Sequence, residues 1–143
     1  MIKGVVKYIQ RLGSNMPIHV NWNDEAKQVI RVDYEGKWEW DEFFDANKQT
    51  QALMGGVDHR VDVIADMKNG HMPTTGASFT FAKNSFRTLP ANWGVMVIVT
   101  SLFIGKLVDV FKQLDRQFGS KLYTASTVEQ AHDIIQKQRA KTK

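Results

Sequence analysis

The sequence contains no cysteine and only three prolines among its 143 residues. The absence of cysteine excludes disulfide bonds and thiolate chemistry. There is also no run of about 18 apolar residues, so we expect no helix that spans a bilayer. The first fifteen residues lack an uninterrupted apolar stretch and a small-residue cleavage site, and we do not expect a signal peptide. Together these absences predict a cytoplasmic protein.

Motifs of common catalytic and metal sites are missing as well. The sequence has no G-x-S-x-G elbow, no Walker loop and no G-x-G-x-x-G turn. The four histidines, at positions 19, 59, 71 and 132, stand in no recognised metal-ligand spacing. We therefore predict a protein that is not an enzyme and that uses no metal or other cofactor.

The net charge of +4 comes from the two ends of the chain. Residues 13–136 carry twelve basic against fifteen acidic side chains, so this central part is slightly acidic. A nucleic-acid-binding surface usually has a basic stripe within the folded body. We therefore expect no nucleic-acid binding and interpret the basic ends as solvated tails, with a phosphate-binding arm as the alternative.

Hydrophobic periodicity predicts one domain over residues 16–143, preceded by an N-terminal extension, residues 1–15. Residues 18–22 and 29–34 alternate between apolar and polar side chains, which indicates a hairpin of two strands that Gly36 ends. Residues 40–54 have helical periodicity, and Gly55 and Gly56 follow them.

The rest of the chain alternates between strands and helices. Strands are expected at 61–66, at 94–99 and from 122, and helices at 79–89, at 103–118 and from 128 to 135. Residues 126–129, Ser-Thr-Val-Glu, resemble a capping box that opens the last helix. The order β-β-α-β-α-β-α-β-α predicts an α/β fold with a single mixed, mostly parallel sheet and an antiparallel N-terminal hairpin.

This order of elements resembles a known family. Residues 34–43 and 58–62, and the closing sequence ASTVEQAHDII, are similar to the STAS domain (sulfate transporter and anti-sigma-factor antagonist), in particular to a poorly characterised bacterial branch. The resemblance covers residues 16–136. It implies a STAS-like fold and a regulatory function.

Regulatory STAS proteins act through the loop between the third strand and the second helix. That loop carries an Asp-Ser-Ser-Gly-like motif whose second hydroxyl residue is phosphorylated. Here Thr75, before Gly76, matches the phospho-acceptor in type, but Pro73 stands where the family has Asp, and the spacing from Asp66 is about one residue short. A phosphate on Thr75 near a helix start would be favoured by the helix dipole and would repel an acidic partner. Alternatively, Thr74 or Thr75 caps the second helix.

A second argument concerns position in the sheet. Ligands of open parallel sheets bind beyond the carboxyl ends of the strands. The candidate interaction residues there are Asp66, Lys68, Asn69, His71, Thr74 and Ser101. They offer polar groups without an obvious nucleophile–base pair, and simple loop solvation is the alternative.

Trp22 and Trp38 lie on or beside the edge hairpin, where tryptophan often marks an interface. We therefore expect a protein-facing patch there, with a homodimer as one possible assembly.

The leading functional prediction is a non-catalytic protein-interaction or regulatory module that presents residues 67–78 to a protein partner whose identity the sequence does not give. A carrier of small apolar ligands or lipids, with a CRAL-TRIO-like build, is the alternative. A hydrolase or transferase and a nucleic-acid binder are further alternatives.

Overall fold

The computed structural model describes residues 17–71, 89–101, 105 and 119–141. Within them the elements are β1 (Ile18–Trp22), β2 (Val29–Lys37), α2 (Trp40–Gly55), β3 (Val61–His71), β4 (Trp93–Val99), β5 (Leu122–Ala125) and α6 (Val128–Lys141). The predicted N-terminal extension and the predicted helices at 79–89 and 103–118 lie wholly or largely outside the described residues.

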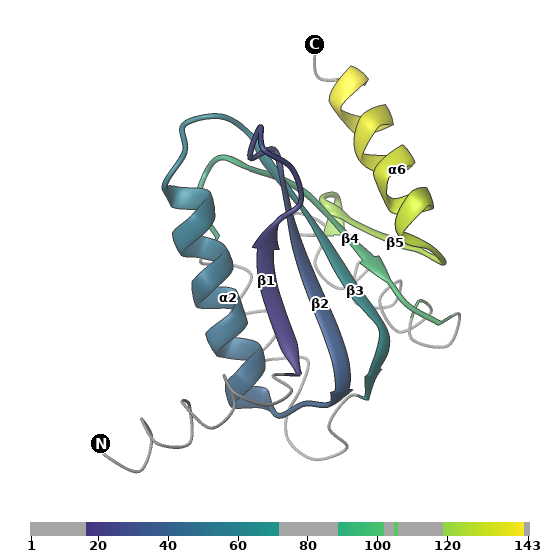
Figure 1. Cartoon of the computed structure of the whole chain (residues 1–143). Helices are drawn as coiled ribbons and strands as arrows, with labels where there is room; N and C mark the ends of the chain where they lie inside the picture. The colour runs from purple at the N-terminus through teal and green to yellow at the C-terminus, as the bar shows by residue number, and fades with distance from the viewer. Residues whose placement is uncertain (1–16, 72–88, 102–104, 106–118, 142–143) are drawn as a thin grey trace.

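The five strands form one sheet in the order β1-β2-β3-β4-β5 (Figure 1). β1 and β2 are antiparallel, and all other neighbouring pairs are parallel. The predicted α/β class, the mixed sheet and the antiparallel hairpin are therefore confirmed. The expected neighbours β3 and β4 lie side by side, with Ile64 paired to Val97 and Asp66 to Val99.

The two faces of the sheet carry separate hydrophobic cores. Successive side chains of a strand point to opposite faces, so alternate residues of β4 fall into different cores. Met96 and Ile98 face the side that α2 covers, whereas Val95, Val97 and Val99 face the side of α6. Figure 1 shows α2 beside the β1 end of the sheet and α6 beside the β5 end.

Local sequence explains how both helices begin. In α2, the Glu39 and Glu42 side chains form a capping box, and Asp41 and Glu42 lie in the first turn, where acids favour the helix dipole. In α6, Thr127 Oγ1 accepts a hydrogen bond of 3.1 Å from the Gln130 amide, and Gln130 Oε1 accepts one of 2.8 Å from the Ser126 amide. The predicted cap at 126–129 is thus corrected, because its returning side chain is Gln130 and not Glu129.

β2 and β3 are longer than predicted. Gly36 does not end β2, and Lys68, Asn69 and Gly70 belong to β3 instead of a loop. After a register shift, Glu35–Lys37 pair with Asn69–His71, so each strand supplies the backbone partner that lets the other continue. This mutual pairing overrides the turn preference of the Lys-Asn-Gly sequence.

Candidate functional site

Asp66 lies where the pairing between β3 and β4 ends, at the carboxyl edge of the sheet. It forms a charged cluster with Arg31 and Asp33 of β2. It is the direct Cα partner of Asp33. Arg31 binds both carboxylates, with Nε 2.9 Å from Asp33 Oδ1 and Nη2 3.3 Å from Asp66 Oδ2. The Lys68 amide donates to the other Asp66 oxygen at 3.2 Å. These contacts engage both Asp66 oxygens, and Arg31 shares its single positive charge between the two carboxylates, so the three side chains together keep one net negative charge.

Ser101 lies two residues after the end of β4, the strand that neighbours β3. It is exposed, and its carbonyl accepts a hydrogen bond of 2.9 Å from the Gly105 amide. Since Asp66 pairs with Val99, the structure brings Asp66 and Ser101 to the same edge of the sheet. No group of three or more possible metal-ligating side chains occurs among the residues that the structure describes.

The remaining candidates of the third strand lie on a segment that we call the β3 extension, residues 67–71. The last pair between β3 and β4 is Asp66 with Val99, so this segment continues past β4 with β2 as its described neighbour. Lys68, Asn69 and His71 are exposed on it. They were expected in a loop and instead lie on a strand. Thr74 and Thr75 lie outside the described residues, and their predicted functions stay predictions.

An aromatic cluster supports the β3 extension. The Trp38 ring lies 5.3 Å from Tyr34, 5.1 Å from Trp40 and 5.8 Å from Phe43, measured between centroids. A Cβ at position 70 would come within 2.8 Å of Tyr34 Cβ and 3.2 Å of Trp38 Nε1. Gly70 therefore lets the strand backbone lie directly on these two rings.

The same packing corrects the expectation for the tryptophans. Trp38 is only 1% exposed, so its side chain is part of the core and does not present a protein-facing patch. Trp22 is half-buried on the edge strand β1 and packs against that core. Burial also raises the pKa of the Tyr34 hydroxyl above its ordinary value, which keeps this side chain neutral inside the cluster.

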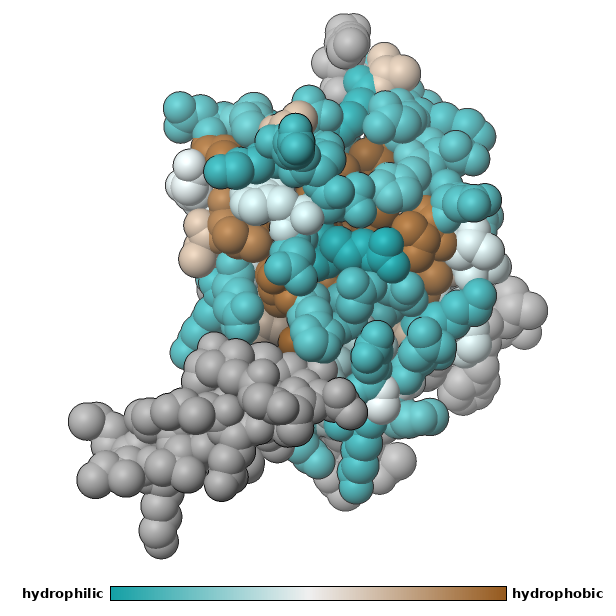
Figure 2. All heavy atoms as spheres, in the orientation of Figure 1, coloured by the Kyte–Doolittle hydropathy of each residue, from teal (hydrophilic) through white to brown (hydrophobic). Residues whose placement is uncertain are grey.

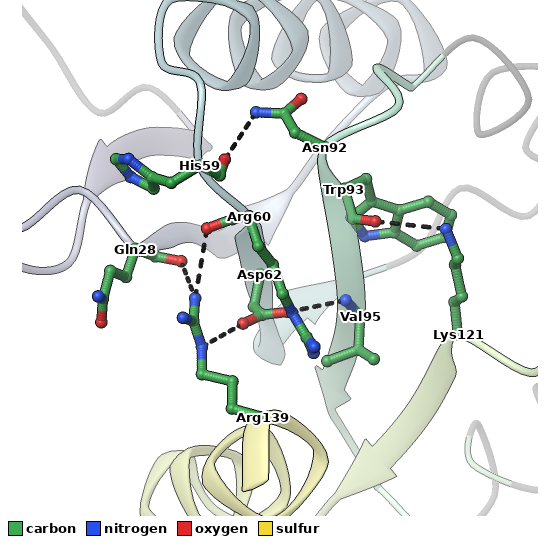
Figure 3. A network of polar contacts seen from close by, with 9 residues as sticks. All are labelled: Gln28, His59, Arg60, Asp62, Asn92, Trp93, Val95, Lys121 and Arg139. Atoms are coloured by element: carbon green, nitrogen blue, oxygen red, sulfur yellow. Dashed lines mark hydrogen bonds and ion pairs between the residues drawn. The ribbon is translucent and has the colours of Figure 1, made fainter. Parts of the chain in front are cut away.

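A second polar cluster lies at the opposite, amino-terminal edge of the parallel strands (Figure 3). Asp62 of β3 is 0% exposed, and its Oδ1 accepts hydrogen bonds from Arg60 Nε at 3.0 Å and the Val95 amide at 2.8 Å. Its Oδ2 accepts one of 2.7 Å from Arg139 Nε of α6. Arg139 Nη2 also donates to the Gln28 carbonyl at 2.9 Å. Asp62 thus connects two strands and a helix.

Two neighbouring side chains order the loops at this edge. Asn92 Nδ2 lies within 2.9–3.2 Å of the carbonyl oxygens of Met54, Val57 and His59, the end of α2 and the segment after it. Lys121 Nζ donates to the Trp93 carbonyl at 3.3 Å (Figure 3). These contacts fix the start of β4 against its neighbours.

On the α2 face, a small apolar cavity lies between the helix and the sheet. Its volume is about 30 Å³, and Val32, Phe43 and Ile98 are among its lining residues. This is room for one or two water molecules, whereas pockets for small ligands usually reach at least about 300 Å³. The cavity therefore gives no support to a lipid carrier.

We compared the chain with known protein families and with curated proteins. No family model matches the chain, and no curated protein matches its sequence. Among the described residues, no helix is long and apolar enough to cross a membrane.

Sequence reasoning did not identify the side chains that bind the buried Asp62 and the half-buried Asp66. Arg31 and Asp33 alternate on one face of β2, and this pattern signals a polar patch on that side of the sheet. Asp62 stands among the apolar residues Val61, Val63, Ile64 and Ala65, which signals a buried charge that needs a partner. The sequence could not identify Arg139 as this partner, because it lies 77 positions away in the chain.

Proposed function

We propose that this chain is a non-catalytic protein-interaction or regulatory module of STAS-like type, and that a protein partner contacts the β3 extension. The observation that carries the proposal is the exposure of Lys68, Asn69 and His71 on a strand whose Gly70 is packed on Tyr34 and Trp38. A surface that is already ordered loses less conformational entropy on binding than a flexible loop.

The charged cluster next to the extension supports binding over catalysis. Arg31 forms ion pairs with both Asp33 and Asp66, so these three side chains are engaged with one another within the fold. The face shown in Figure 2 is mainly hydrophilic in its described part, with hydrophobic residues in small patches. A polar contact through the extension agrees with such a surface better than a broad apolar interface does.

Site-specific photo-crosslinking in cells tests this function. A photoreactive side chain at position 68 should give a discrete adduct with one partner protein, which mass spectrometry then identifies. The matched control carries the same group at position 48, because Lys48 is an exposed lysine of α2, away from the extension. The adduct should also disappear when the chain with the photoreactive group at position 68 carries the additional substitution His71→Glu, which changes the same exposed surface. Equal adduct patterns at positions 68 and 48 would refute the proposal.

A further inference from the structure

An open pocket of about 500 Å³ lies at the edge of the sheet opposite the β3 extension. Its walls come from the segment before β3, the start of β4, the residues before β5 and Gln138 of α6. The volume falls within the range of about 300–1,000 Å³ that is typical of small-molecule sites. The pocket is independent of the function proposed above.

Lys121 places an ammonium group at this pocket. The side chain is exposed, yet its Nζ lies 5.0 Å from the centroid of the Trp93 ring and 3.3 Å from the Trp93 carbonyl oxygen. A lysine ammonium has three donor protons, and within the described part of the chain this carbonyl is its hydrogen-bond acceptor. The cation is thus held in place by the ring while donors remain for a ligand.

Arg60 contributes a second cation, and Gly94 makes room for it. A Cβ at position 94 would collide with Arg60 Nε and Asp62 Oδ1, so only glycine lets the arginine lie across the start of β4. Asp62 is bound by both Arg60 and Arg139, so these three residues together carry one net positive charge. Asp58 is the single carboxylate in the pocket lining, against the two cations Arg60 and Lys121.

The rest of the lining is partly apolar. Ala91, Val95 and Tyr123 contribute hydrocarbon and aromatic surface beside the cations. An inorganic ion would contact only the charged part of this lining. A molecule with a carboxylate at one end and an apolar body at the other would match both parts.

The geometry points to a binding site for a small organic carboxylate, with the carboxylate at Lys121 and Arg60 and the apolar body against Val95 and Tyr123. Lys121 is the residue to test, because it is exposed and makes no ion pair with any residue that the structure describes, whereas Arg60 also binds Asp62.

Titration of the full chain with benzoate, followed by amide shifts in NMR spectra, tests this site. We expect saturable binding with the largest shifts at residues 93–95 and 121, and no saturable binding of benzamide, which has the same ring without the charge. Lys121→Gln should weaken benzoate binding about ten-fold, the value expected for one charge-assisted hydrogen bond. Lys137→Gln, which removes an exposed lysine of α6 outside the pocket, is the matched control and should bind as the unchanged chain does.

Three results would overturn the inference. The first is the absence of saturable benzoate binding, and the second is shifts spread over the surface. The third is an equal effect of the Lys121→Gln and Lys137→Gln substitutions. The spectrum of each free variant shows whether it is folded, so a loss of binding is not confused with a loss of structure.

Discussion

Asp62 is a charged residue in the buried first half of β3, among Val61, Val63, Ile64 and Ala65. Transfer of an isolated carboxylate into a protein interior costs several kcal/mol, so this residue is stable only because three donors surround it. The donors are Arg60, which directly precedes β3, the Val95 amide of β4 and Arg139 of α6. A single side chain therefore fixes the position of α6 against the sheet, in addition to the apolar contacts of Ala131 and Ile135.

Removal of Arg139 should be strongly destabilising. Arg139→Met keeps most of the aliphatic length but leaves the buried Asp62 with Arg60 as its remaining cation. We expect a decrease of about 3 kcal/mol in the free energy of unfolding, measured by urea denaturation. Lys137→Met removes an exposed cation two residues earlier on α6 and should change stability by less than about 0.5 kcal/mol. Equal losses in the two variants would show that the Asp62 contact contributes little.

At the scale of single elements, the sequence predicted those parts that depend on local pattern. The alternation of Ile18, Val20 and Trp22 defined β1, and the helical spacing of Phe43, Ala46, Thr50 and Met54 defined the buried side of α2. Each pattern is contained in one element and reflects its own periodicity, so no knowledge of distant contacts was needed.

The end of β3 could not be predicted in the same way. Lys68-Asn69-Gly70 has the composition of a turn, and it is a strand because β2 continues alongside it to Lys37. The burial of Trp38 has a related cause, since it depends on contact with Gly70, more than 30 residues away. Both features arise from pairing between elements, and a single sequence does not show which segments meet. The candidate residues Asp66 and Ser101 were identified by the general rule for strand ends, but their partners were not.

The contact between Gly70 and the aromatic cluster leads to a prediction about the β3 extension. Gly70→Ala should lower the free energy of unfolding by about 1–3 kcal/mol, because the new Cβ has no space beside Tyr34 and Trp38. The matched control is Gly55→Ala at the end of α2, where nothing lies within 4 Å of the added Cβ. That change should be neutral or stabilising by up to about 1 kcal/mol, because alanine favours the helix. Thermal or urea unfolding measures both, and a neutral Gly70→Ala would contradict the packing described.

At the scale of the whole molecule, the parallel arrangement gives the sheet two chemically different edges. The carboxyl edge carries the Arg31–Asp66 cluster and the β3 extension, where we propose that a protein partner binds. The amino edge carries the Asp62 network and the cationic pocket, which we assign to a small carboxylate. The central strands β3 and β4 connect them, and β4 is buried along nearly its whole length. These buried strands are one physical connection between the two edges.

This arrangement predicts an uneven distribution of local stability. β3 and β4 are paired on both sides and covered by helices or apolar side chains, whereas β1 pairs only with β2 in the described part of the sheet. Amides of residues 62–65 and 95–98 should exchange with solvent only by global unfolding, roughly 100-fold more slowly than those of residues 19–22. Native-state hydrogen exchange at increasing denaturant concentration measures this difference. If the exchange rates of β1 and β4 amides depended on denaturant in the same way, the sheet would open as one unit, and the predicted difference in local stability would be wrong.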